Sequence, residues 1–305
     1  MTRAEAEQLL ELSRAAELLG PQQAAWTERL TPERERLAEA VRFFAGAGEG
    51  EAATELAANV WRLWLYSGDV GSARDLLATG LEAGEGRPSR ARALALYADG
   101  LLAFRIGAQE DSRARNEAAL EVARAVGDAE AESLALVGLS RVAFREGDYP
   151  RVRALASQAQ ELTRDLDPAA GVMPLHLLAA GTRLGGDHDQ AIDLYTESLE
   201  LNRRLGDDRM AGVELHNIGH IEVHRGNLEA AERCFTECAA LRNPDDPYDL
   251  AMGNLNEAAL AFGHGDPFRA ADLLRRTEST LRDAGIVLDP DDAYEVDWLR
   301  ERVSA

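Results

Sequence analysis

Three histidines, His216, His220 and His224, recur every four residues in a segment with helical periodicity. This spacing places their side chains in one stripe along a helix. Two of them could chelate Zn²⁺, with His176 as a third ligand. All three cannot share one ion, because the first and last lie about 12 Å apart along a helix axis. No glutamate follows His216 as in a metalloprotease motif. We therefore interpret the histidines as polar groups that hydrogen-bond a ligand, and we predict no metal site.

The other reactive side chains have structural interpretations. Cys234 and Cys238 lie four residues apart in one predicted helix, where a disulfide is geometrically unfavourable, so we expect reduced thiols in a packed position. Residues 187–189, Asp-His-Asp, follow a glycine turn and fit an N-cap. Residues 289–292 are acidic and contain proline, which indicates a helix start and not a calcium loop. The sequence has no P-loop motif. We predict no catalytic residues, no enzymatic activity and no cofactor.

A glycine, usually followed by Asp or Asn, returns every 39 or 40 residues. So regular a period indicates a stacked array of helical hairpins. The glycine fits the left-handed residue that ends the first helix of a hairpin, and the next residue fits the N-cap of the second helix, as Asn227 would. These cue glycines are Gly68, Gly107, Gly147, Gly186, Gly226 and Gly265.

Small residues recur seven positions before the cue glycine, where we expect the two helices of a hairpin to approach closely. Larger side chains recur nine positions after it. Asn116 and Ala156 interrupt the second series, so we expect looser packing in their units. The first series is Gly100, Ser140, Ala179, Gly219 and Ala258, with Trp61 as the one exception, and the second is Leu77, Asn116, Ala156, Tyr195, Phe235 and Leu274.

The chain is strongly acidic, with 54 Asp and Glu against 33 Lys and Arg among its 305 residues and a net charge of −21. Such a surface repels nucleic acids and anionic membranes, so we expect neither as a partner of this chain alone. No apolar run reaches the length of a membrane span, and the N-terminus lacks the apolar core of a signal peptide. We therefore expect a soluble, cytoplasmic protein.

The motif around the fifth cue resembles the long, roughly 40-residue form of the tetratricopeptide repeat. Residues 20–44 and 265–295 further resemble the flanks of the repeat region in large actinobacterial LuxR-type and AfsR-type ATPase regulators, although their P-loop and their basic DNA-binding helix are missing. A free-standing repeat protein and an excised sensor domain both remain open. The motif is Ile218-Gly219, then Gly226-Asn227-Leu228-Glu229-Ala230-Ala231, then Phe235.

This resemblance implies an all-α fold, a right-handed superhelix of about six helical hairpins. Residues 1–50 would form N-terminal helices packed on the array, residues 51–288 the repeat array, and residues 289–305 a C-terminal capping helix. The first helix of each hairpin would line the concave inner face, with inner-face side chains ten, six, three and two residues before the cue. Asparagines nine residues before it resemble those that hold a peptide backbone or carboxylate in this family.

The inner-face positions carry arginines, histidines and aromatic residues, so their net charge is positive although that of the whole chain is negative. We predict a non-catalytic interaction or sensor protein that holds an acidic or carboxylate-bearing protein or peptide in this groove, in transcriptional or biosynthetic regulation. Alternatively, the arginines are solvated or paired with Glu of a neighbouring hairpin, or the groove holds a small anionic molecule as a sensor ligand or substrate. The predicted groove consists of Asn59, Arg62, Tyr66, Tyr97, Phe104, Arg105, Arg141, Phe144, Arg145, His176, Arg183, His216, Asn217, His220, His224 and Asn256.

The first hairpin is unusually aromatic, with Trp61, Trp64 and Tyr66 close to Trp26. We expect most of these rings to lie in the core beneath the N-terminal helices. If Trp64 faced solvent instead, it would mark a docking patch or a homodimer contact.

Overall fold

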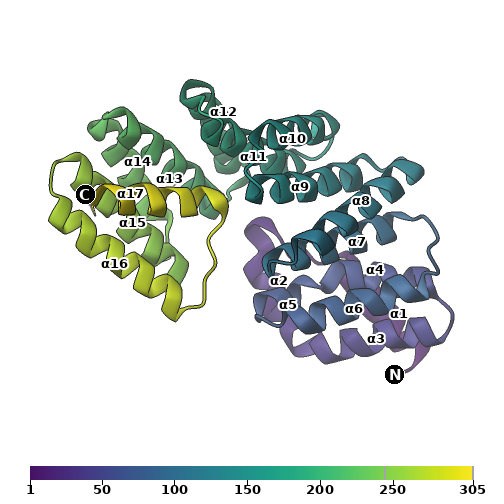
Figure 1. The fold of residues 1–305 in the computed structure, drawn as a ribbon. Coiled ribbons are helices and arrows are strands. Elements are labelled where there is room, and N and C mark those ends of the chain that lie inside the picture. Colours follow the sequence, from purple (N-terminus) through teal and green to yellow (C-terminus); the bar gives the residue numbers. More distant parts are fainter. Residues whose placement is uncertain (244, 304–305) are drawn as a thin grey trace. The chain divides into compact units, whose positions relative to one another are not determined.

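The computed structural model describes residues 1–243 and 245–303, and this part of the chain is built from helices joined by short turns, with no strand (Figure 1). The all-α prediction is confirmed. Helices follow one another as antiparallel pairs: α7 packs on α8, α13 on α14, and α15 on α16. No helix within the described residues is long and apolar enough to cross a bilayer.

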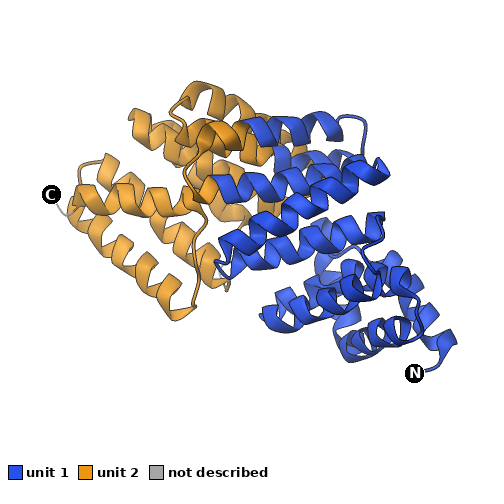
Figure 2. Ribbon diagram, turned by 45° about the vertical axis from the view of Figure 1, so that its right-hand side comes forward, with its two compact units in different colours: residues 1–143, 154–174 blue, residues 144–153, 175–305 orange. Residues whose placement is uncertain are grey.

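The helices fall into two units, which Figure 2 shows in different colours. Unit 1 comprises Met1–Ala143 and Ala154–Pro174, and unit 2 comprises Phe144–Arg153 and Leu175–Ala305. Helices α9 (Ala129–Arg145), α10 (Tyr149–Thr163) and α11 (Val172–Leu184) contribute residues to both units. Each unit therefore contains several hairpins, and each is described by itself below.

Unit 1 begins with helices that precede the repeats and continues into regular hairpins. A capping box starts the first helix, since the Thr2 side chain accepts from the amide of Glu5 while the Glu5 carboxylate accepts from the amide of Thr2. Its helices are α1 (Arg3–Arg14), α2 (Gln23–Leu30), α3 (Arg34–Gly46), α4 (Gly50–Val60), α5 (Arg62–Tyr66), α6 (Val70–Ala83), α7 (Arg90–Arg105) and α8 (Gln109–Val126), with 3₁₀ turns at Gly20–Gln22, Thr31–Glu33 and Pro168–Gly171.

Unit 2 contains three first helices, three second helices and one further helix at the C-terminal end. Apolar residues of the last two hairpin helices and of the final helix share one core cluster. Its helices are α11 (Val172–Leu184), α12 (His188–Leu205), α13 (Asp208–Arg225), α14 (Leu228–Leu241), α15 (Pro247–Gly263), α16 (Pro267–Asp283) and α17 (Pro290–Val303).

The six cue glycines all adopt the left-handed conformation that their sequence position predicts, with φ between +74° and +93°. After the cue, Asp69 and Asp187 cap the next helix by accepting from the backbone amides of Ser72 and Gln190. Asn227 occupies the N-cap position of α14 without such a bond, because its side-chain amide donates to Glu222 instead. The left-handed glycine is therefore present at all six cues, whereas the capping hydrogen bond of the next residue is not.

The two periodic positions of the packing pattern meet inside the hairpins. A Cβ on Gly219 would lie 2.3 Å from the ring of Phe235, and one on Gly100 would lie 2.5 Å from the Asn116 amide. Asn116 is fully buried, and Gly138 of the next hairpin also lacks the Cβ that would collide with it. The expectation of looser packing around Asn116 was wrong, because two glycines enclose this side chain.

The tryptophans of the first hairpin belong to the core of unit 1. Trp61 is 1% exposed and stands at the break between α4 and α5, and Trp64 is 4% exposed. The solvent-facing Trp64 that would have marked a dimer contact is therefore not found. A homodimer remains a prediction without that support.

Candidate functional site

The final helix α17 lies over the first helices of unit 2, alongside α13 and α15 in Figure 1. Its acidic side chains contact predicted groove residues of α11 and α13, and they also contact Tyr248 at the N-terminal end of α15. We call the covered surface the unit 2 face, defined by Arg183, His216, Asn217, His220, His224 and Asn256.

Glu295 of α17 is the centre of these contacts. The Arg183 guanidinium donates to one carboxylate oxygen of Glu295 and also to the Asn217 amide oxygen. The other oxygen lies 3.0 Å from Nδ1 of His220 and 2.9 Å from Nε2 of His224. Burial alone would raise the pKa of Glu295, but the positive charge of Arg183 and the two histidine contacts hold it well below its usual range.

Asp292 of α17 makes the second polar contact. The Tyr248 hydroxyl donates to Asp292 Oδ2 at 2.7 Å, and Nε2 of His216 lies 3.3 Å from Oδ1. Arg242 donates to Nδ1 of His216 at 3.2 Å, which leaves the ring proton on the nitrogen that faces Asp292. Burial lowers the pKa of His216 well below its usual value, and the charge of Arg242 adds to this effect. His216 is therefore neutral near pH 7.

Burial sets the charge state of two further groups beside these carboxylates. It lowers the pKa of His220 to about 4, so this ring is also neutral near pH 7. Burial and the neighbouring charge of Asp292 raise the pKa of Asp291 to about 7. Burial likewise raises the pKa of Asp292 itself.

The remaining contacts of α17 are mostly aromatic and apolar, together with an exposed ion pair between Arg300 and Glu278 of α16. Trp298 stacks on His224, with ring centroids 4.3 Å apart, and meets Phe262 of α15 edge-on. Val296 and Leu299 join the core cluster formed with α15 and α16. The N-terminal half of α17 is thus held mainly by buried charges and the C-terminal half mainly by packing, with one exposed ion pair.

The groove prediction missed a buried carboxylate on α13. Glu214 is fully buried, accepts from the Ser198 hydroxyl at 2.7 Å, and lies 3.1 Å from Nδ1 of His176. Across residues 1–243 and 245–303, no group of three or more His, Cys, Asp or Glu side chains is arranged to hold a metal ion. Cys234 and Cys238 are free thiols, and the Cys238 thiol contacts the Gly212 carbonyl at 3.1 Å.

The prediction also missed the acidic side chains of α17, although a signal for them was present. Residues 289–292 were interpreted as a helix start, and Pro290 does begin α17. However, Asp291, Asp292 and Glu295 are buried instead of solvated. The signal was their opposite charge, since a cationic face in an acidic chain favours one of its own acidic helices.

Unit 1 presents a different arrangement at equivalent repeat positions. Arg62 and Arg141 both stand six residues before a cue glycine, and Tyr97 stands ten before another. Arg141 donates to the Tyr97 hydroxyl at 3.4 Å, and the guanidinium of Arg62 lies 4.3 Å from the centre of the Trp61 ring. We call Arg62, Tyr97 and Arg141 the unit 1 face.

The unit 1 face holds two cations close together. Burial lowers the pKa of Arg62, and the neighbouring Arg141 charge contributes to this, while Tyr97 and Tyr66 act in the opposite direction. Among the residues that the structure describes, neither arginine forms an ion pair with a carboxylate. An anion placed between them would meet two guanidinium donors and a phenol.

The other predicted groove residues of unit 1 are Asn59, Tyr66, Phe104 and Arg105. Asn59 donates to the Ser13 hydroxyl at 3.1 Å, and the Tyr66 hydroxyl donates to the Leu18 carbonyl at 2.5 Å, so both hold the N-terminal segment. Phe104 is buried and Arg105 is exposed.

The structure places two further groove residues, from the end of α9, in unit 2. Phe144 packs edge-on against Tyr149. Arg145 lies 3.9 Å from Asp289. The predicted set is therefore divided between two faces.

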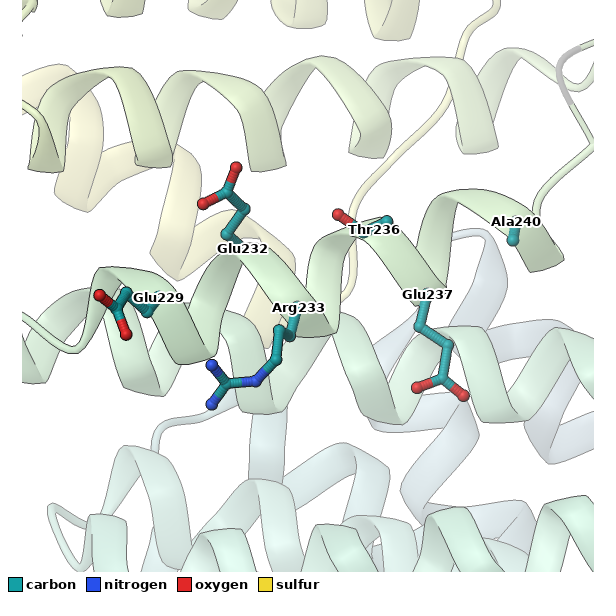
Figure 3. Close-up of a pocket in the computed structure, with 6 residues that line it drawn as sticks. All are labelled: Glu229, Glu232, Arg233, Thr236, Glu237 and Ala240. Carbon is teal, nitrogen blue, oxygen red and sulfur yellow. The ribbon is translucent and has the colours of Figure 1, made fainter.

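A surface depression runs along α14 (Figure 3), on a second helix away from the unit 2 face. All the residues that line it come from this one helix, and all are exposed. Three of them are glutamates, and none is a predicted groove residue. It has no buried polar group to orient a ligand, so it is not a candidate site. The lining residues are Glu229, Glu232, Arg233, Thr236, Glu237 and Ala240.

Comparisons with known proteins support the repeat assignment within unit 2. Residues 172–243 match the profile of the tetratricopeptide repeat. This segment contains α11 to α14, and thus most of the unit 2 face. A comparison with curated proteins finds no significant sequence match. Nothing in the comparisons connects the chain with the ATPase regulators, so that lineage remains a prediction.

Three solved structures with a similar fold cover between 82% and 99% of the chain. A Rap protein in complex with the competence and sporulation factor has a TM-score of 0.62 at 12% identity, covering 99% of this chain and 96% of that one. The Cut9–Hcn1 hetero-tetramer of APC/C gives 0.65 at 14%, covering 98% and 51%. PilF of Pseudomonas aeruginosa gives 0.54 at 16%, covering 82% and 98%. At these identities the likeness concerns the fold alone.

Proposed function

We propose that this chain is a non-catalytic interaction protein that holds an acidic or carboxylate-bearing segment of a protein or peptide on the unit 1 face. The observation that carries the proposal is the pair of arginines, Arg62 and Arg141, which converge on Tyr97 without a carboxylate of the described chain between them. Stacked repeats provide extended binding surfaces, which favours a chain-like ligand.

The electrostatic cost of placing the two arginines together favours an anionic ligand. Partly burying a guanidinium without a counter-ion is unfavourable, and two neighbouring guanidinium groups also repel each other. A bound carboxylate would remove both costs and would accept from planar donors that suit its geometry. The Rap protein of similar fold was crystallised with a bound factor, which is consistent with such a role.

The regulatory setting and a cytoplasmic location are proposed on narrower grounds. The regulatory setting depends on the resemblance of residues 20–44 and 265–295 to the flanks of regulator repeats. A small anionic molecule is the second candidate ligand, since the same three side chains would bind it.

Binding of a labelled peptide tests the proposal. The probe is a fluorescein-labelled peptide with several glutamates and a free C-terminal carboxylate, and its match has glutamines and a C-terminal amide. We expect the acidic peptide to bind preferentially, and the Arg62→Ala/Arg141→Ala chain to lose roughly 30-fold or more, because each charge-assisted hydrogen bond contributes about 1.5–3 kcal/mol.

The matched control is Arg87→Ala/Arg124→Ala, which removes two exposed arginines of unit 1. Equal affinity of the two double variants for the acidic peptide would rule out the unit 1 face as its site. Calorimetry with citrate examines the second candidate: micromolar affinity for citrate without peptide binding would favour a small-molecule ligand.

A further inference from the structure

We propose that the unit 2 face is a second binding surface, whose ligand is an acidic helix of a partner protein, and that α17 is the chain's own competitor for it. This goes beyond the function proposed above, because it concerns other side chains and another unit. The partner helix would present a carboxylate, a second carboxylate three residues later and an aromatic ring three residues after that. In α17 these are Asp292, Glu295 and Trp298.

The contacts of α17 are those of a recognised ligand more than those of a helix that only closes a core. Two of its carboxylates are buried against an arginine and three histidines, and its tryptophan stacks on one of these histidines. A helix that merely caps an array needs apolar contacts, such as those of Val296 and Leu299. Buried ion pairs contribute specificity while adding little net free energy, because desolvation offsets attraction. The polar half of α17 is therefore selective but weakly held.

The connection to α16 allows α17 to leave and return. It consists of residues 284–289 between Asp283 and Pro290, with Gly285 in the left-handed conformation and Val287 77% exposed. A helix on so short a tether has an effective concentration on the order of millimolar. A free partner must therefore bind more tightly than α17 does, or gain additional contacts on another surface.

Asp291 gives the partner a way to bind more tightly. It is buried in the docked helix, and Asp292 is its immediate neighbour in sequence. Near neutral pH a buried carboxyl in this position must either keep its proton or place a second negative charge beside Asp292, and both oppose docking. A partner helix with a neutral residue at this position, and with the other three groups retained, is the better ligand.

The experiment offers α17 to the full chain as a separate peptide. The probe is a fluorescein-labelled peptide of residues 288–303, and the chain carries Glu295→Gln to weaken its own α17 without a change of shape. We expect the Glu295→Gln chain to bind the peptide at least tenfold more tightly than the wild-type chain does. A peptide that itself carries Glu295→Gln should bind at least tenfold more weakly, and one with Asp291→Asn several-fold more tightly.

Two results would overturn the proposal. One is equal affinity of the peptide for the wild-type and Glu295→Gln chains. The other is amide exchange of α17 in the Glu295→Gln chain that is as slow as in α15 and α16, which would make α17 part of the unit 2 fold. The Arg62→Ala/Arg141→Ala chain serves as the control. Carried on the Glu295→Gln background, it should bind the peptide unchanged, so failure here is distinguishable from failure at the unit 1 face.

Discussion

The inner-face positions of the two units carry different side chains and meet different partners. Six residues before a cue glycine, unit 1 carries Arg62, Leu101 and Arg141, whereas unit 2 carries Ala180, His220 and Ala259. In unit 2 the surrounding cation Arg183 meets a carboxylate of the chain's own α17. In unit 1, Arg141 donates to the Tyr97 hydroxyl, and the positive charges of Arg62 and Arg141 repel each other.

The positive charge on the unit 2 face is therefore balanced by a carboxylate of the same chain, whereas that on the unit 1 face is not balanced by a carboxylate among the described residues. Around Glu295, burial has removed the charge of His220, so Arg183 is the principal cation that balances the carboxylate. The unit 1 face has a surplus of positive charge and half-buried donors. A repeat array can therefore place a balanced and an unbalanced cationic surface on the same scaffold by changing a few side chains.

Reversing the buried charge of unit 2 should have the largest effect. In Arg183→Glu, two buried carboxylates would face each other, and breaking a buried pair in this way costs roughly 3–5 kcal/mol. We expect the protection factors of α17 amides to fall by about a hundredfold or more while α13 and α15 remain protected. Hydrogen exchange followed by mass spectrometry measures this. Arg62→Glu is the matched change in unit 1 and should leave α17 unaffected; unchanged protection in Arg183→Glu would remove the basis of the comparison.

The pH dependence of α17 should reveal Asp291. Its pKa is raised to about 7 in the docked helix from a usual value of 3.8, so its uncharged form favours docking at low pH and this contribution is lost as pH rises through about 7. At pH 8, Asp291→Asn should therefore protect α17 at least tenfold more than the wild type does. At pH 5 the advantage should be smaller, and it should vanish only below the usual value of 3.8, where wild-type Asp291 is protonated in both the docked and the undocked helix. Equal α17 protection factors in the wild-type and Asp291→Asn chains at both pH values would contradict the raised pKa of Asp291.

Salt should distinguish the two faces by a smaller amount. Binding of an acidic peptide to the partly exposed unit 1 face should weaken about fivefold between about 0.05 and 0.5 M NaCl, because exposed charges are screened. The protection of α17 should change by less than about twofold, because Glu295 and Arg183 are shielded from solvent. Peptide anisotropy and hydrogen exchange at the two salt concentrations test this pair of expectations. Equal salt sensitivity would mean that the two faces are equally exposed in solution.

Local features of the fold were predictable because short-range geometry determines them. The left-handed turn that ends a helix depends on the φ angle of one residue, which glycine adopts readily. The cue glycines therefore located the hairpins correctly. The contact between Gly219 and Phe235 follows from helical periodicity within one hairpin. Asn116 was misjudged because its second neighbour, Gly138, belongs to the following hairpin.

The pairing of α17 with its face was not predictable in this way. Arg183 and Glu295 are 112 residues apart, and no periodic pattern specifies which helix of the array a terminal helix will cross. The sequence indicated a cationic row and, separately, an acidic helix start. Their combination depends on burial and on the course of residues 284–289, which a local pattern does not contain. The division of the predicted groove into two units was missed for the same reason.

The enclosure of Asn116 has an evolutionary consequence. Gly100 and Gly138 leave no room for even one extra carbon beside this amide, so the three positions cannot vary independently. A lineage that enlarges either glycine must shrink the asparagine in the same step or soon after. Descendants of this chain should therefore exchange these three residues as a linked set, and an alignment of them would display the coupling as covariation between neighbouring repeats.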